Sequence, residues 1–236
     1  MKDVTDQASM DETIYEINGL RLGLPGALAT DAIAEKLREG SYEGDEARAV
    51  DRCVRPGFRV LELGAGLGYV GTLAAKKTEP ENVLSVEANP DLLPVIEANH
   101  ARNGVGEVSL MHGAVVGHAA EGATAKFHLA AGFTGSRLGA KGGRQVEVPL
   151  IGFHELLRAH RPHVVLMDVE GAEAQFFDRP WKCPLRFCVM EIHPKQYDAA
   201  VIKKIVDRMS SMDMTYDPVT SRGKILGFRK VWSEGS

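Results

Sequence analysis

A glycine-rich turn after a short apolar run is the feature that most constrains this chain. Residues 60–63 read Val-Leu-Glu-Leu, and glycines follow at positions 64, 66 and 68. Glycine adopts backbone angles that other residues rarely reach, and it leaves no side chain between the backbone and a ligand. With a helix expected over 69–77, the pattern predicts a strand, a tight turn and a helix that bind a nucleoside-like ligand at the turn.

The spacing of the glycines separates two classes of cofactor. A dinucleotide-binding turn has the pattern G-x-G-x-x-G, which packs the helix closely behind a diphosphate. Here Gly68 comes one residue early and Tyr69 fills the expected position. The pattern E-x-G-x-G-x-G, which begins at Glu62, resembles the S-adenosylmethionine (SAM) loop of class I methyltransferases. This segment favours SAM over a dinucleotide.

A second acidic residue supports nucleoside binding. Glu87 ends a predicted strand over 83–87, about 20 residues beyond the loop, where a ribose-binding acid is expected. A carboxylate there can accept hydrogen bonds from both ribose hydroxyls. Asn89 and Pro90 look like the N-cap and first turn of a helix that reaches residue 102. Dinucleotide and SAM enzymes both use such an acid, so Glu87 does not decide between them.

The order of the expected elements indicates an α/β fold. Strands and helices alternate from residue 58, which implies a parallel sheet with right-handed crossovers. The expected strands cover 58–63, 83–87, 107–112, 163–167 and 186–192, and the helices cover 69–77, 91–102, 153–160, 172–177 and 198–212. The last two strands, 214–216 and 224–231, are separated only by a turn and should be antiparallel.

The chain is expected to form one structural domain. Residues 1–57 are interpreted as an N-terminal cap with a frayed start up to about residue 12, a strand or hairpin at 14–22, and helices at 31–39 and 46–54. Residues 58–236 make up the main domain. Within it, residues 113–150 are rich in Gly and Ala and break the alternation, so an inserted hairpin or flap is predicted, with strands at 126–129 and 145–148.

Composition narrows the functional class. The 236 residues are 44% apolar, which suits one ordinary core, and the net charge of −4 without a basic block indicates no nucleic-acid partner. No apolar run approaches the ~20 residues of a membrane span, and the polar N-terminus predicts no signal peptide. Three cysteines without metal-ligand spacing suit a reducing compartment. We expect a cytoplasmic enzyme without a membrane partner; a homodimer is left open.

Two later strands end in ionisable side chains. Asp168 and Glu170 follow the strand at 163–167, and Glu191 and His193 end the next strand. Alternation puts the members of each pair on one side of their strand. Ligands of open α/β sheets bind at the carboxyl ends of the strands. If the two strands are neighbours, these four side chains should lie close together at one such ligand-binding edge. Such crowding perturbs pKa values and is typical of functional sites.

The run Asp-Val-Glu-Gly-Ala-Glu at 168–173, with the glycine loop at 63–68 and Glu191-Ile192-His193, resembles the FkbM family of SAM-dependent methyltransferases. The resemblance covers residues 42–193. It implies a Rossmann-like class I methyltransferase fold, with a mostly parallel seven-stranded sheet, helices on both faces and an antiparallel C-terminal hairpin. Members often have an aspartate where this chain has Glu62 and an asparagine where it has Ala65. The resemblance further implies O-methylation of a hydroxyl on a small metabolite, sugar or natural product.

The four ionisable groups are the catalytic candidates. His193 is the first choice as general base because imidazole titrates nearest neutral pH, and Glu170 is the second if burial raises its pKa. Asp168 is expected to face the cofactor. Mg²⁺ or Mn²⁺ held by Asp168, Glu170 and His193 is a less favoured alternative. A hydrogen-bonded carboxylate–histidine base requires fewer groups to be placed correctly than a metal site does. Glu170 and Glu173 could instead serve only as favourable charges in the first turn of a helix, and Glu173 is assigned that role.

The expected cofactor-binding residues come from the loop, the strand ends and the segments that should face them. They are Glu62, Gly64, Ala65, Gly66, Gly68, Tyr69, Val70, Glu87, Ala88, Asn89, Gly113, Ala114, Asp168, Tyr42, Glu46 and Ser136.

Two other functions remain as alternatives. An NAD(P)-dependent oxidoreductase would need the missing glycine spacing, and a non-catalytic nucleoside-cofactor-binding protein would not need the acidic and histidine cluster. Asp-Val-Glu-Gly at 168–171 stands where nitrogen methyltransferases of nucleic acids usually have Asn/Asp-Pro-Pro-aromatic, so the acceptor is expected to be a small hydroxylated molecule.

Overall fold

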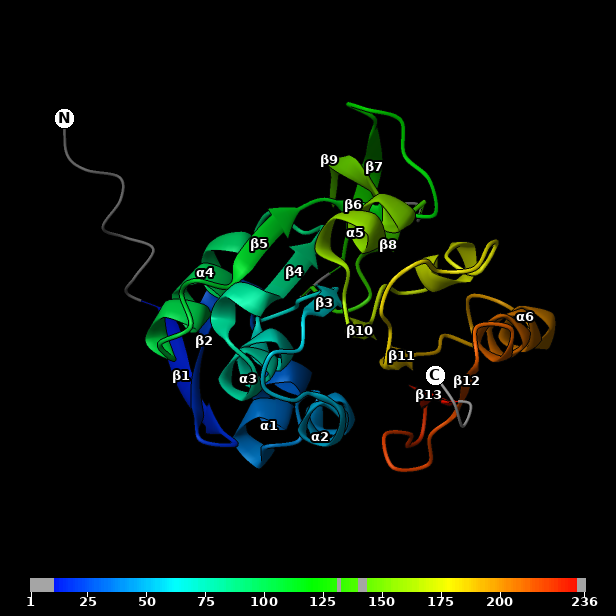
Figure 1. The fold of residues 1–236 in the computed structure, drawn as a ribbon. Coiled ribbons are helices and arrows are strands. Elements are labelled where there is room, and N and C mark those ends of the chain that lie inside the picture. Colours follow the sequence, from blue (N-terminus) through cyan, green and yellow to red (C-terminus); the bar gives the residue numbers. More distant parts are fainter. Residues whose placement is uncertain (1–10, 131–132, 140–143, 233–236) are drawn as a thin grey trace.

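The computed structural model describes residues 11–130, 133–139 and 144–232, so the expected frayed start at residues 1–10 lies outside the described part. Its centre is a seven-stranded sheet (Figure 1). The strands are, in spatial order, β12 (Met214–Tyr216), β13 (Ile225–Lys230), β11 (Phe187–Glu191), β10 (Val164–Met167), β3 (Val60–Leu63), β4 (Val83–Glu87) and β5 (Ser109–His112). All pairs from β11 to β5 are parallel, and β13 is antiparallel to both neighbours. The predicted mostly parallel sheet with an antiparallel C-terminal hairpin is confirmed.

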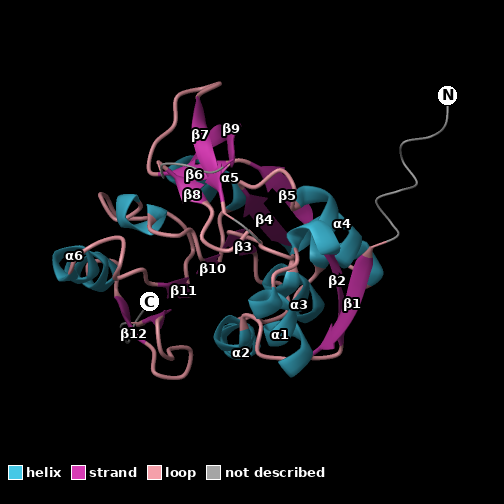
Figure 2. Cartoon of the chain, turned by 180° about the vertical axis from the view of Figure 1, so that it is seen from behind, coloured by secondary structure: helices cyan, strands magenta, loops and turns pink. Residues whose placement is uncertain are grey.

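Helices cover both faces of this sheet, as predicted (Figures 1 and 2). On β3, Val60 packs into one apolar core and Leu61 into the other, because neighbouring side chains of a strand point to opposite faces. The first core contains side chains of α1 (Asp31–Glu39), α2 (Gly44–Cys53), α3 (Tyr69–Lys77) and α4 (Leu93–Arg102), and the second contains side chains of α5 (Phe153–His160) and α6 (Ala199–Ser210). No helix in the described part of the chain is long and apolar enough to cross a membrane.

An N-terminal hairpin supports the glycine turn from outside. Strands β1 (Glu12–Ile17) and β2 (Leu20–Pro25) pair antiparallel, and β2 lies against α4 (Figure 2). The amide of Asn99 on α4 accepts from the Gly23 N–H at 2.7 Å and donates to the Gly23 carbonyl at 3.2 Å and the Leu67 carbonyl at 2.9 Å. One buried side chain therefore links the hairpin to the turn that follows β3.

The segment between β5 and α5 is a second small sheet rather than a hairpin alone. Four strands pair in the order β6-β9-β7-β8 and extend beyond the ends of β4 and β5 (Figure 1). Their bounds are β6 (Ala114–Val116), β7 (Thr124–Leu129), β8 (Arg137–Leu138) and β9 (Arg144–Gly152). The strands expected at 126–129 and 145–148 fall within β7 and β9. The parts of this segment at 131–132 and 140–143 lie outside the described residues.

Two local expectations are wrong. The helix expected at 172–177 is a single 3-10 turn, Ala172–Gln175. Helix α4 begins at Leu93 rather than directly after Asn89, whose side-chain oxygen accepts from the Asp91 N–H at 3.0 Å and closes a turn of its own. An asparagine before proline can cap a helix or close such a turn, so the residue types alone did not separate the two.

The backbone at Gly64 brings the ends of three strands together. The Gly64 N–H donates to the Val86 carbonyl on β4 at 2.9 Å, and the Asp168 N–H donates to the Leu63 carbonyl at 2.9 Å. Gly64 has φ +83°, and a Cβ at this position would lie 1.9 Å from the Asp168 carbonyl oxygen. Only glycine allows this approach, so the glycine fixes how closely β3 and β10 end beside each other.

Gly64→Ala should therefore lower the free energy of unfolding by about 3 kcal/mol, from left-handed backbone strain together with overpacking against Asp168. Gly57→Ala is the matched control, because Gly57 also has a positive φ, +76°, but nothing lies within 4 Å of the added Cβ. The control should lose only about 1 kcal/mol. Urea unfolding measures both variants, and equal losses would contradict a steric role for Gly64.

One acidic side chain lies inside the sheet itself. Glu62 on β3 is 2% exposed and accepts a hydrogen bond from the Ser85 hydroxyl of β4, its partner in the strand register. Burial raises the pKa of Glu62 to about 7, although the hydrogen bonds with Ser85 and the Gly71 backbone lower it in part. The folded protein therefore binds a proton at Glu62 more tightly than the unfolded chain does.

The stability contributed by protonated Glu62 is fully present below its unfolded pKa and is lost as the pH rises through the folded value of about 7. Glu62→Gln removes this dependence. As the pH rises from 4.5 to 8, the unfolding free energy of the variant should increase relative to that of the wild type by up to about 3 kcal/mol, since one pKa unit corresponds to about 1.4 kcal/mol. The measurement is the difference in unfolding free energy across this range, and a constant difference would contradict the assignment.

Candidate functional site

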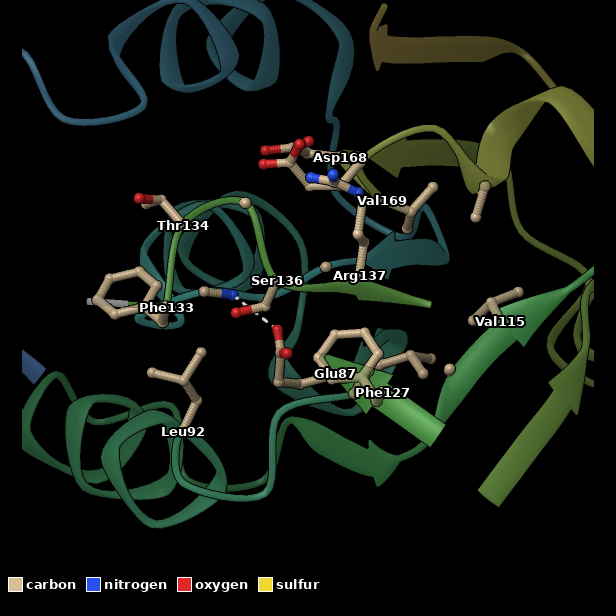
Figure 3. Close-up of a pocket in the computed structure, with 18 of the residues that line it drawn as sticks. Glu87, Leu92, Val115, Phe127, Phe133, Thr134, Ser136, Arg137, Asp168 and Val169 are labelled. Atoms are coloured by element: carbon tan, nitrogen blue, oxygen red, sulfur yellow. Dashed lines mark hydrogen bonds between the residues drawn. The ribbon is translucent and has the colours of Figure 1, made fainter. Parts of the chain in front are cut away.

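A cavity opens where the glycine turn, the ends of β4 and β10 and the small sheet meet. Glu87, the last residue of β4, and Asp168, which directly follows β10, approach it from two sides, and Ser136 and Arg137 at the start of β8 lie between them (Figure 3). Its apolar wall is formed by side chains that include Leu92, Phe127 and Phe133. Glu87 and Asp168 thus share one cavity at the carboxyl ends of β4 and β10, the two strands that flank β3 in the parallel sheet.

Glu87 is held by the backbone around it. One carboxylate oxygen accepts from the Gly66 N–H at 3.1 Å and the other from the Asn89 N–H at 2.7 Å. Burial raises the pKa of Glu87, and these backbone donors partly offset the rise. A carboxylate fixed beside an apolar wall suits a nucleoside, because the acid can accept from ribose hydroxyls while the base lies against the wall.

The expected cofactor residues divide into three groups. Those that line the main cavity are Tyr42, Gly64, Gly66, Glu87, Ala88, Gly113, Ala114, Ser136 and Asp168. Those that line a smaller adjoining cavity are Glu46, Glu62 and Val70, together with Gly64 and Asp168. Those that line neither of these cavities are Ala65, Gly68, Tyr69 and Asn89.

The third group supports the loop from behind. Ala65 and Tyr69 are buried in the core, and the Tyr69 hydroxyl accepts from the Asn18 side chain at 2.6 Å. Gly68 begins α3 and faces Ile96 and His100, where a Cβ would lie 3.0 and 3.1 Å from the nearest atoms. Asn89 is 3% exposed and contributes its backbone N–H to Glu87.

The smaller cavity is lined by a concentration of carboxylates. They belong to Glu43, Glu46, Glu62, Asp168 and Glu191. Burial is the main cause that raises the pKa of Glu46 to about 7 and that of Glu43 well above its usual value. Such a cavity is electrostatically suited to a cationic group, which would relieve the repulsion. Glu43 was not among the expected cofactor-binding residues, although its neighbour Tyr42 was. The position of the Glu43 side chain depends on a left-handed φ of 45° at the start of α2, which the sequence does not reveal.

Asp168, Glu170 and His193 converge at the rim of the main cavity. His193 Nε2 lies 3.3 Å from an Asp168 carboxylate oxygen and 3.5 Å from a Glu170 carboxylate oxygen. Glu170 has a left-handed φ of 51°, a conformation that costs about 1 kcal/mol or more in a non-glycine residue. The structure therefore brings these three candidates together at the expense of backbone strain.

The ring of His193 is held in its protonated form. Burial lowers the pKa of His193, but the contacts with Asp168 and Glu173 and the negative charges of these two residues outweigh it and raise the pKa to about 10. This differs from the expectation of an imidazole that titrates near neutral pH. The physical reason is that the carboxylates of Asp168 and Glu173 lie on either side of the ring, beside Nε2 and Nδ1.

Glu173 lies in the first turn of the 3-10 helix at Ala172–Gln175, as expected, but its contacts extend beyond those of a helix-terminus charge. Glu173 is fully buried, and its side chain accepts from His193 Nδ1 at 2.9 Å, from the Tyr197 hydroxyl at 2.6 Å and from the Gly171 N–H at 2.9 Å. Tyr197 in turn accepts from the His193 N–H at 2.8 Å. Glu173 thus orients the ring of His193, a role that depends on a partner 20 residues later in the chain.

Glu191 does not join the cluster around His193. Its carboxylate pairs with the Lys224 ammonium at 3.2 Å and lines the smaller acidic cavity. His193 lies beyond the end of β11, in an irregular stretch, so strand alternation no longer determines which side it faces.

A second polar hollow adjoins the main cavity beside Glu170. Glu170, Arg137, Val169 and Ala172 line both spaces. The hollow adds the side chains of Gln175 and Gln196. Glu170 therefore connects the cluster with Asp168 and His193 to a hollow that contains hydrogen-bonding side chains.

Comparisons with known proteins agree with this geometry. The Methyltransferase FkbM domain matches residues 63–218, more than half of the chain. Ribosomal protein L11 methyltransferase of Thermus thermophilus is 45% identical over 58 residues, a match that spans 25% of this chain and only 22% of that protein.

Solved structures resemble the fold at low sequence identity. A putative transferase from Pyrococcus horikoshii has a TM-score of 0.50 at 11% identity, over 92% of this chain and 71% of that one. Ribosomal protein L11 methylase from Lactobacillus delbrueckii subsp. bulgaricus has a TM-score of 0.46 at 15% identity, over 81% and 80% of the two chains. The family match, with the glycine turn, the strand order and the acidic cavity edges described above, identifies the chain as a member of the FkbM family of SAM-dependent methyltransferases.

Proposed function

We propose that this protein transfers the methyl group of SAM to a hydroxyl oxygen of a small hydroxylated molecule. The observation that carries the proposal is the cluster of Asp168, Glu170 and His193, in which Asp168 lines the main cavity and Glu170 lines both that cavity and the polar hollow. Two substrates bound on the two sides of this cluster would meet at it. Ionisable groups at that point suit an acceptor that must lose a proton.

The residues of the main cavity fit SAM. Gly64 and Gly66 leave the backbone open to the ligand, Glu87 can accept from the ribose, and the apolar wall suits the adenine. The acidic cavity suits the cationic ammonium of the methionine part, and one oxygen of buried Glu62 has no hydrogen-bond partner in the described structure. When bound, SAM supplies a methyl group on a positively charged sulfur.

The polar hollow suits the acceptor. Gln175 and Gln196 can each donate and accept hydrogen bonds, and Arg137 offers several donors. Such side chains recognise hydroxyl groups and can hold one of them in line for transfer. Alignment of two reacting groups can itself lower a barrier by several kcal/mol.

Incubation with SAM that carries a radiolabelled methyl group, against a panel of sugars, polyols and phenols, tests the proposed acceptor class. We expect label in a small molecule, with mass spectrometry and NMR locating the methyl group on oxygen. Total RNA and total protein from the same cells form separate arms of the assay. Label in either arm, without transfer to any small hydroxylated molecule, would contradict the proposal.

Glu87→Gln should weaken SAM binding by about 10- to 100-fold, because a hydrogen bond to a charged acceptor contributes about 1.5–3 kcal/mol. Glu81→Gln is the control, since Glu81 lies just before β4 outside the lining of the cavity. Isothermal titration calorimetry measures SAM, NAD and NADP in parallel. Unchanged SAM affinity in Glu87→Gln would exclude Glu87 as a ribose ligand, and binding of NAD or NADP without SAM would contradict the proposed function.

A further inference from the structure

We propose that Asp168, Glu170 and His193 form a binding site for one divalent cation, of which Mn²⁺ is the best match. The site itself follows from the geometry of the three side chains. Only its role in activating the acceptor rests on the proposed function. This cation would bind at the edge of the main cavity that Asp168 and Glu170 line, on the side opposite Glu87.

The three side chains have the spacing of metal ligands. Each offers one ligand atom, and the three atoms lie within 4.8 Å of one another. Adjacent ligands around an ion with bonds of about 2.1 Å are separated by about 3 Å, and opposite ligands by about 4 Å. The distances of 3.3 and 3.5 Å from His193 Nε2 to the two carboxylates fall in this range. Small side-chain movements would therefore complete the coordination.

His193 is oriented as metal-bound histidines are. Its Nδ1 is hydrogen-bonded to Glu173, which is fully buried and also accepts from Tyr197. With Nδ1 occupied, Nε2 is the nitrogen directed at the two carboxylates, and a bound ion would replace the proton that Nε2 otherwise carries. A histidine ligand commonly donates its other ring N–H to a carboxylate in this way, which fixes the ring and increases its basicity.

Asp168 supplies an independent observation. Its Oδ1 atom is inaccessible to solvent and has no hydrogen-bond partner in the described structure, because the 3.3 Å contact with His193 lacks hydrogen-bond geometry. Among the described residues His193 is the one charged group paired with this oxygen, so a hydrogen-bonding or coordinating partner is still missing there. Within the described residues, no lysine or arginine forms an ion pair with Asp168 or Glu170. A bound cation would satisfy this oxygen and offset the repulsion between the two carboxylates.

The ligand types determine the choice of ion and its role. Two carboxylates favour hard ions such as Mg²⁺ and Mn²⁺, and the imidazole favours Mn²⁺ of the two. Three protein ligands leave coordination positions for water or an acceptor hydroxyl, whose pKa the ion would lower. In the transfer, the acceptor O–H bond breaks and its proton passes to water. The oxygen forms a bond to the methyl carbon, and the carbon–sulfur bond breaks with its electron pair remaining on sulfur.

Titration of metal-free protein with MnCl₂, followed by electron paramagnetic resonance of free Mn²⁺ and by calorimetry, tests the site. We expect one Mn²⁺ per chain, and at least about a 10-fold loss of affinity in Asp168→Asn and in Glu170→Gln. Glu173→Gln should weaken binding by about 10- to 100-fold, as expected when the hydrogen-bonding partner of a ligating histidine is changed. Asp207→Asn is the matched control, since Asp207 lies on α6 and pairs with Lys203.

Circular dichroism and SAM titration of the same samples separate the possible failures. Absence of stoichiometric Mn²⁺ binding in a wild type that binds SAM would overturn the metal site alone. Wild-type Mn²⁺ affinity in folded Asp168→Asn and Glu170→Gln would overturn it as well. If the wild type binds Mn²⁺ and these variants bind it more weakly, the metal site is supported even when the protein does not bind SAM. Failure to bind SAM would overturn the proposed function instead.

Discussion

The contact between the Gly64 backbone and the Asp168 carbonyl is the constraint on which the site depends. A side chain at position 64 would overlap this carbonyl, so only glycine lets β3 and β10 end so close together. The parallel pairing of β3 with β4 and β10 then places Glu87 on one side of Gly64 and Asp168 on the other. A single backbone approach thus determines how far apart Glu87 and Asp168 lie across the cavity.

Around this turn the fold gathers buried carboxyl groups at a cost in stability. Burial raises the pKa values of Glu43, Glu46 and Glu62, and the carboxylates of Asp168 and Glu170 share one rim. An apolar core would be more stable than these buried acids. The arrangement makes physical sense when cations occupy it: the ammonium and sulfonium groups of SAM and the divalent ion inferred above. Binding and stability are therefore linked, because each cation offsets repulsion that the folded protein otherwise bears.

Much of the fold could be predicted because it depends on local signals. The glycines at 64, 66 and 68, the alternation of apolar strands and helices, and the cap of α1, where Thr30 accepts from the Ile33 N–H at 3.3 Å, are all readable from short stretches of sequence. The sequence also placed Asp168, Glu170 and His193 in one cluster, since strands that follow each other in a parallel sheet often end side by side.

What could not be predicted depends on tertiary contacts. Glu173 has the position of a helix-terminus charge, yet it is buried against His193 and Tyr197, which come from beyond the next strand. Glu191 would share a face with His193 only if the strand continued, and it ends at Glu191. The carboxylates of Asp168 and Glu173 also raise the pKa of His193 above the expected range, which no residue spacing encodes.

One measurement tests the shared cavity most directly: hydrogen–deuterium exchange with and without SAM, followed by mass spectrometry. We expect SAM to slow the exchange of backbone amides at 64–70, 86–89 and 168–173 together. Slower exchange at the first two segments with no change at 168–173 would contradict the account.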